Sequence, residues 1–255
     1  LLHWFQEEEP EIWAKVRSFL APAGYVTMKL TGRRIMDTSR ASMTLLFNQV
    51  ERRWWIEMLQ TFNIPLELLP QLFEPWEAVG DLTPEGASIL GIEPGAVVLA
   101  GCVDTVAACI GLGNTAPGCG TLILGTTGRV VLTIDTPHFD GRFVNQCHAV
   151  PRAWICTGAT NNAGGSLKWF VTNFGQAEKA VAERTGISPF ELMDAAAACS
   201  SIGSNGVIYL PYLSGERSPI WNSHARGVFF GLSDHSTYGD IVRSVLEGVA
   251  FSFRD

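Results

Sequence analysis

Residues 96–110, AVVLAGCVDTVAACI, decide the fold class of this chain. The apolar run at 96–100 predicts a buried strand, and the apolar run at 105–110 predicts a helix that begins directly after Asp104. Strands and helices that alternate in this way along a chain are typical of an α/β architecture. We therefore expect an α/β fold around this segment.

The residues before this stretch predict mostly helices. Asp37 and Thr83 are candidate N-caps, and Pro84 suits a first helical position. Pro22 and Gly24 indicate the end of the first helix. The expected helices cover residues 11–20, already under way at Leu1, and residues 38–48, 51–62 and 84–90.

The residues after Asp104 predict a hairpin and then mixed elements. Two β runs at 121–124 and 129–134 flank the tetrapeptide GTTG at 125–128, which is typical of a hairpin turn. Further strands are expected near 143–149, 154–157, 206–210 and 227–231, and helices near 164–174, 176–186 and 189–199 and from Asp240 onward.

A turn-rich loop at 135–141 gives the best boundary between two domains, 1–135 and 136–255. The first residues carry neither Met nor the basic and small residues of a secretory signal, and the last follow an apolar helical run directly. We expect an internal portion of a longer polypeptide.

Composition excludes several classes of protein. Hydrophobic residues make up 47% of the 255, which excludes a disordered chain. The net charge of −7 argues against a nucleic-acid or anionic-membrane surface, and no apolar run reaches the length of a membrane span. The six cysteines show no zinc-ligand spacing and favour a reducing cytoplasm. Low charge and eight tryptophans suit a homodimer interface or, equally, a large core.

Three features are candidate binding or catalytic sites. Asp104 is a lone carboxylate between apolar elements, and it either caps the helix or faces a cleft. The hairpin tip at Gly125, Thr126 and Thr127 offers hydroxyls and backbone N–H groups that suit phosphate oxygens, although most such tetrapeptides are only turns. The glycine pair at 164–165 opens a helix, where free N–H groups suit an anion or the glycines serve packing alone.

Other nucleotide and hydrolase motifs are missing or misplaced. Gly111 and Gly113 approach a dinucleotide-binding pattern, but they are expected at the exit of a helix and not at its start. The chain has no Gly-Lys pair, which excludes a Walker A loop, and neither an HExxH nor a GxSxG motif.

Four segments together resemble the FGGY family of carbohydrate kinases, of the actin-like ATPase superfamily. The most specific is GVFFGL at 227–232 with Asp240-Ile241 and SVLE at 244–247, which is similar to a family signature. PYLSGERSP at 211–219, LAGCVD at 99–104, and LTG at 30–32 followed by Asp37, Ser39, Ala41 and Ser42 also resemble family segments.

The resemblance implies a partial two-lobe, ribonuclease H-like fold, with residues 1–135 in the sugar-binding lobe and 136–255 in the nucleotide-binding lobe. It implies that Asp104 is the general base that takes a proton from a sugar hydroxyl as this oxygen attacks ATP, with Mg²⁺ neutralising phosphate charge. No residue of this chain is assigned as a metal ligand. The implied nucleotide contacts are Gly125, Thr126, Thr127, Gly164, Gly165 and Lys168.

The resemblance also implies the substrate class. Family members phosphorylate sugars or polyols, and a ketopentose such as xylulose is favoured, with a small alditol such as erythritol or glycerol as the alternative. A silent relative that binds sugar or nucleotide stays open as well. Because the family's first phosphate hairpin and adenosine clamp are missing from these 255 residues, we expect no turnover from them alone.

Overall fold

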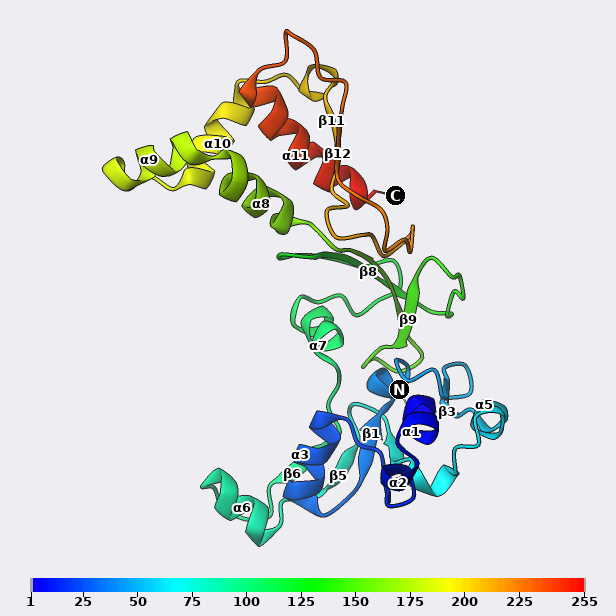
Figure 1. The fold of residues 1–255 in the computed structure, drawn as a ribbon. Helices are drawn as coiled ribbons and strands as arrows, with labels where there is room; N and C mark the ends of the chain where they lie inside the picture. Colours follow the sequence, from blue (N-terminus) through cyan, green and yellow to red (C-terminus); the bar gives the residue numbers. More distant parts are fainter. Residues whose placement is uncertain (1, 255) are drawn as a thin grey trace. The chain divides into compact units, whose positions relative to one another are not determined.

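The computed structural model describes residues 2–254, and the contacts divide the chain into two compact units (Figure 1). Each unit is made of three separate stretches of the chain. The predicted domains, 1–135 and 136–255, differ from this division and stay a prediction. Unit 1 is Leu1–Cys119, Thr133–His138 and Asn145–Ile155; unit 2 is Gly120–Leu132, Phe139–Val144 and Cys156–Asp255.

Unit 1 starts with helices whose boundaries differ from the prediction. The helix predicted over 11–20 is wrong beyond Trp13, and a helix begins at Pro22, where the sequence predicted an end. Proline fits the first helical position because its missing N–H would have no intrahelical partner there. Position 24 of this helix requires glycine, because a Cβ there would lie only 2.6 Å from the carbonyl oxygen of Ile35. The helices are α1 (Leu2–Glu8), α2 (Pro10–Trp13) and α3 (Pro22–Thr31).

The next segment contains a hairpin that the sequence analysis missed. The predicted helices over 38–48 and 51–62 are too long. Leu45 has a φ of 62°, and the chain turns there into two antiparallel strands. The apolar residues of a short hairpin can have the same spacing as those of a helix, so periodicity alone did not distinguish the hairpin from a helix. The elements are β1 (Ile35–Asp37), α4 (Thr38–Ala41), β2 (Phe47–Asn48), β3 (Arg53–Trp54) and α5 (Ile56–Thr61).

The remaining elements of unit 1 lead to the predicted catalytic aspartate. The Thr83 hydroxyl accepts a hydrogen bond from the Gly86 N–H, which confirms the predicted N-cap. β1 pairs with β4 in parallel, and β5 pairs with β6 in antiparallel orientation. The elements are β4 (Gln71–Phe73), β5 (Ala78–Asp81), α6 (Pro84–Leu90), β6 (Val97–Leu99) and α7 (Asp104–Gly111).

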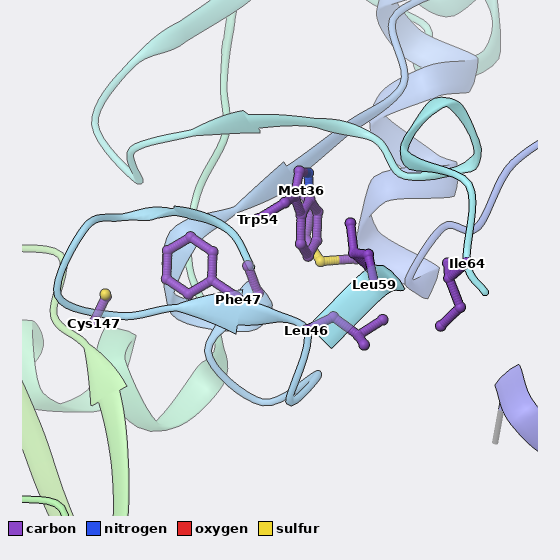
Figure 2. Packing of buried hydrophobic residues seen from close by; sticks show 8 residues of the cluster. Met36, Leu46, Phe47, Trp54, Leu59, Ile64 and Cys147 are labelled. Carbon is purple, nitrogen blue, oxygen red and sulfur yellow. The ribbon is translucent and has the colours of Figure 1, made fainter. Parts of the chain in front are cut away.

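The main core of unit 1 forms around Trp54 (Figure 2). Its indole N–H donates to the carbonyl of Pro70 at 3.0 Å, so the one polar atom of this buried ring is satisfied. The Phe47 ring packs edge-on to Trp54, which joins the two strands of the missed hairpin. The buried members are Met36, Ala41, Leu46, Phe47, Trp54, Leu59, Ile64 and Cys147.

Unit 2 contains the predicted hairpin. Strands β7 (Gly120–Leu124) and β8 (Gly128–Ile134) pair in antiparallel register with Leu124 opposite Gly128, which confirms the turn at 125–127. They belong to a four-stranded sheet of order β7-β8-β10-β9, with β9 at Val144–Cys147 and β10 at Trp154–Thr160.

The helices of unit 2 confirm the predicted helices, with boundaries that differ by at most two residues at their starts and one at their predicted ends. Phe170, Val171, Met193, Tyr209, Val242 and neighbouring residues form the core of this unit, which packs α8, α10 and α11 against β11. None of the helices within residues 2–254 is both long and apolar enough to cross a bilayer. The elements are α8 (Gly164–Phe174), α9 (Gln176–Thr185), α10 (Pro189–Ala198), β11 (Ile208–Leu210), β12 (Val228–Phe230) and α11 (Tyr238–Ser252).

Candidate active site

Asp104 is the first residue of α7, and its side chain is exposed. The N-cap of α7 is Val103, and no side-chain cap bond is made there. One carboxylate oxygen, Oδ1, accepts from the backbone N–H of Thr105 at 2.6 Å and from its hydroxyl at 3.2 Å. Within residues 2–254, Oδ2 makes no hydrogen bond. Asp104 is therefore not the N-cap, although its Oδ1 accepts one N–H at the helix start. The other alternative, that Asp104 faces a cleft, stays a prediction.

The hairpin tip carries its polar groups on two sides. The carbonyl of Gly125 accepts from the Gly164 N–H at 2.9 Å, and the carbonyl of Thr126 accepts from the N–H groups of Ala163 and Gly165 at 2.9 and 3.0 Å. The hydroxyls and amides of Thr126 and Thr127 are exposed and make no hydrogen bond to any described residue. These groups are the ones available to an anion.

The helix start at Gly164 and Gly165 differs from the expected anion site. Its leading N–H groups are not free, because they donate to the hairpin carbonyls. The glycines are required for this contact, since a Cβ on Gly164 or Gly165 would lie 2.9 Å from the carbonyl oxygen of Gly125 or Thr126 respectively. Of the two roles predicted for the glycine pair, close packing therefore describes this helix start. A nucleotide contact by these glycines stays a prediction.

Glycines of the hairpin serve close packing too. Neither Gly125 nor Gly128 has a positive φ, so left-handed backbone is not the reason for glycine at either position. A Cβ on Gly128 would lie 2.3 Å from the ring of Phe253 and 2.9 Å from a methyl carbon of Thr160. Gly128 therefore allows the hairpin to contact the end of α11.

Lys168 lies on the exposed side of α8, one turn beyond the hairpin contact. Its backbone carbonyl accepts from Thr172, whereas its ammonium has no partner among the described residues. The ammonium is therefore available, and its predicted contact with the nucleotide stays a prediction.

The PYLSGERSP loop is held by Glu216, which is buried. Its carboxylate accepts from the Thr160 hydroxyl at 2.7 Å, the Asn161 N–H at 2.9 Å and the backbone N–H of Arg217 at 2.7 Å. The Arg217 guanidinium donates instead to the carbonyl of Thr160. Glu216 therefore fastens the loop to the end of β10 and does not pair with the Arg217 guanidinium.

The carboxylates of the C-terminal signature are also structural. Asp240 closes a capping box with Thr237 at the start of α11, and hydrogen bonds from Ser200 and Thr237 lower its pKa to about 2. Glu247 accepts from Arg243, Ser204 and the Gly203 N–H, and despite the opposing effect of its burial these bonds lower its pKa. Both residues tie α11 to the 199–206 loop.

The predicted site residues divide between the two units. The hairpin residues Gly125 and Thr126 contact Gly164 and Gly165 within unit 2, whereas Asp104 belongs to unit 1. α7 ends at Gly111, and Gly113 just beyond it has a positive φ, so the two glycines lie at a helix end as predicted. A dinucleotide motif would need them at a helix start.

Family models account for nearly the whole chain. Residues 1–111 match the N-terminal domain of the FGGY family of carbohydrate kinases, and residues 120–255 match its C-terminal domain. The chain belongs to the FGGY family. The expected actin-like ATPase fold is thereby confirmed.

Individual FGGY relatives carry different substrate names. The chain is 34% identical over 253 residues to a xylulose kinase of Lactococcus lactis and 31% identical over 250 residues to a gluconokinase of Bacillus subtilis. The match to the xylulose kinase includes 99% of this chain and 48% of the relative, and the match to the gluconokinase includes 98% of this chain and 49% of the relative. The chain thus spans about half the length of the curated relatives it matches.

Solved FGGY structures agree with the fold. A ligand-bound xylulose kinase from Lactobacillus acidophilus superposes with a TM-score of 0.89 at 27% identity, and a gluconate kinase from the same organism with 0.91 at 27%. These matches cover 98% and 100% of this chain, and 49% and 50% of the other.

Proposed function

We propose that the whole protein containing this FGGY chain is an ATP-dependent carbohydrate kinase, in which Asp104 is the general base. The observation that carries the proposal is the exposed carboxylate of Asp104, whose Oδ2 has no hydrogen-bond partner within residues 2–254. A general base needs such an unoccupied acceptor within reach of the substrate proton.

The local geometry of Asp104 suits proton transfer from a sugar hydroxyl. Both bonds from Thr105 go to Oδ1, so they fix the plane of the carboxylate and leave Oδ2 to accept the proton. As the proton leaves, the sugar oxygen forms its bond to the γ-phosphorus and the bond from this phosphorus to ADP breaks. Asp104 acts on the hydroxyl alone and makes no covalent bond.

Thr126 and Thr127 are the proposed phosphate-binding groups. Their exposed amides and hydroxyls have no partner among the described residues, so they are available to phosphate oxygens. The opposite side of the hairpin tip is held by three hydrogen bonds from the start of α8. A tip held in this way loses little further conformational freedom when the phosphate binds.

We propose that Mg²⁺ arrives bound to ATP. Residues 2–254 contain no group of three or more His, Cys, Asp or Glu side chains that could hold a metal. In phosphoryl-transfer sites Mg²⁺ is commonly held by one or two carboxylates and by the substrate phosphates. Because Asp104 is the proposed general base, Mg²⁺ would be held here by the substrate phosphates and would neutralise charge on the transferring phosphate.

For the substrate, we propose a ketopentose such as xylulose. The supporting observation is the 34% identity to a relative named xylulose kinase. Gluconate is the second candidate, because a relative named gluconokinase is 31% identical over almost the same span. A small alditol, the alternative from the sequence, is the third.

An ADP-release assay on the whole protein tests the proposal. Xylulose, gluconate, erythritol and glycerol are compared, and we expect the highest kcat/KM with xylulose. Asp104→Asn should lower turnover by about 10²–10⁴-fold while ATP still binds. A near-normal rate in Asp104→Asn would remove this residue from the mechanism. Sugar or nucleotide binding without ADP release from any substrate would identify a silent relative.

A further inference from the structure

The loop that carries Asp104 is fastened to a distant part of unit 1. Val103, the buried N-cap of α7, donates its backbone N–H to the hydroxyl oxygen of Ser39 at 3.0 Å. Ser39 is 64 residues away, in the short helix α4, and it is completely buried. This hydrogen bond holds the residue that directly precedes Asp104.

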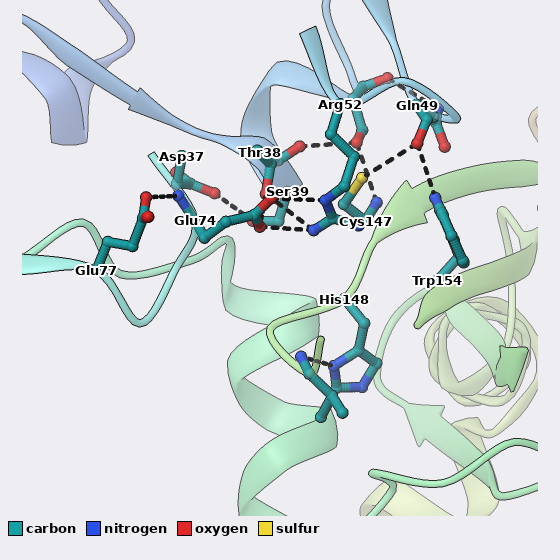
Figure 3. Close-up of polar contacts among 12 residues, drawn as sticks. Asp37, Thr38, Ser39, Gln49, Arg52, Glu74, Glu77, Cys147, His148 and Trp154 are labelled. Carbon is teal, nitrogen blue, oxygen red and sulfur yellow. Dashed lines mark hydrogen bonds and ion pairs between the residues drawn. The ribbon is translucent and has the colours of Figure 1, made fainter. Parts of the chain in front are cut away.

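The Ser39 hydroxyl is oriented by a buried carboxylate (Figure 3). Its proton is donated to Oδ1 of Asp37, so its lone pairs are left for the Val103 N–H. Asp37 is itself completely buried and accepts from the backbone N–H of Arg40 at 2.9 Å and from the Arg40 guanidinium. Hydrogen bonds therefore link Arg40 to Asp37, Asp37 to Ser39 and Ser39 to Val103.

We propose that Asp37 and Ser39 are positioning residues for Asp104, which rests on the proposed role of Asp104 as general base. The charge of Arg40 fixes Asp37, Asp37 fixes the Ser39 hydroxyl, and Ser39 fixes the main chain at Val103. A carboxylate on the next residue is sensitive to this anchor, because a misplacement of about 1 Å can reduce a rate by roughly 10²-fold. Neither residue needs to touch the substrate.

Ser42 provides a matched control within the same turn of chain. Its hydroxyl oxygen also accepts a backbone N–H from a distant segment at 3.0 Å, in this case from Cys147. The hydroxyl donates to the Thr38 carbonyl at 2.8 Å, and Ser42 is 6% exposed. Ser39 and Ser42 are both buried and each accepts one distant backbone N–H, but Ser39 donates to a carboxylate whereas Ser42 donates to a carbonyl. Of the two, Ser39 is the one that holds the segment leading to Asp104.

The test compares Ser39→Ala with Ser42→Ala in the whole protein. Both should lower the melting temperature, because each leaves a buried amide unpaired, and Ser39→Ala should lower it more because Asp37 also loses a hydrogen bond. Ser39→Ala should also lower kcat by about 10–100-fold with little change in the KM for ATP. Ser42→Ala should leave kcat within about twofold, which corresponds to about 0.4 kcal/mol, because Ser42 does not hold the segment that leads to Asp104. Amide exchange over 101–104 should accelerate in Ser39→Ala alone.

Equal kcat values in the two variants, or unchanged exchange at 101–104 in Ser39→Ala, would overturn the positioning role. If Ser39→Ala fails to fold, Ser39→Cys keeps the volume with a much weaker hydrogen-bonding group. It should give an intermediate kcat, and a wild-type kcat would contradict the proposal. Asp104→Asn separates this inference from the proposed function: loss of activity there with normal activity in Ser39→Ala refutes only the positioning role.

Discussion

Asp104 and Asp240 are two aspartates at the starts of helices, and the structure gives them opposite surroundings. Asp240, at the third position of α11, is 1% exposed, and both of its oxygens accept hydrogen bonds, from Ser200, Asn205 and Thr237. Asp104, at the first position of α7, is exposed and keeps Oδ2 unoccupied within the described residues. A carboxylate with both oxygens occupied stabilises its helix, whereas one with an unoccupied oxygen can accept a proton.

The largest effect that tests this comparison is a reciprocal pair of variants. Asp104→Asn should reduce kcat by about 10²–10⁴-fold with little change in the melting temperature. Asp240→Asn should lower the melting temperature by several degrees, because it replaces an acceptor of four hydrogen bonds with an amide that brings N–H groups into a buried site. Activity assays and thermal unfolding check the pair. A stability loss in Asp104→Asn equal to that in Asp240→Asn would contradict the comparison.

Acid unfolding tests the Asp240 half of the comparison. The hydrogen bonds from Ser200 and Thr237 lower the pKa of Asp240 from 3.8 to about 2. Because the folded state holds the charged form, this contribution is present above about pH 4 and is lost as the pH falls towards about 2. The free energy of unfolding, measured with denaturant over a range from about pH 5 to about pH 2 that brackets both pKa values, should depend less on pH in Asp240→Asn than in the wild type. An unchanged slope would contradict the assignment.

Gly165→Ala tests whether the hairpin tip must lie against α8. The new Cβ would approach the Thr126 carbonyl oxygen to 2.9 Å, and such overpacking costs about 1–3 kcal/mol. The KM for ATP should rise as the tip shifts. The control is Gly111→Ala, also at a helical glycine, where a Cβ meets nothing within 4 Å. That control should be neutral or slightly stabilising. Equal effects of both variants on the KM for ATP would argue against the hairpin as a phosphate site.

The smallest effect is expected at Lys168. Its ammonium is exposed and has no partner among residues 2–254, so Lys168→Ala should change stability by less than about 0.5 kcal/mol. An exposed charge contact with the nucleotide is worth up to about 1 kcal/mol, so the KM for ATP should rise by at most about fivefold. Titration of ATP in the activity assay measures this rise. No rise at low ionic strength would remove Lys168 from the predicted nucleotide contacts.

Local chemistry made parts of the fold predictable. Thr83 before Pro84 gave the start of α6, and the GTTG turn gave the β7–β8 hairpin, because caps and tight turns depend on residues adjacent in sequence. The α8 to α10 helices followed from clear apolar periodicity. The N-terminal helices were placed wrongly because Pro22 suits both a helix end and a first helical position.

The family, the α/β class and the identity of Asp104 as the candidate base could all be predicted from the amino-acid sequence, because they depend on residue types in a fixed order along the chain. Which polar groups already have a hydrogen-bond partner became visible only in the folded chain. The tertiary structure assigned the helix-start amides near Gly164 to the hairpin carbonyls and the Ser39 hydroxyl to Val103. Such partners are tens of residues apart, and no pattern of neighbouring residues encodes a hydrogen bond across that separation.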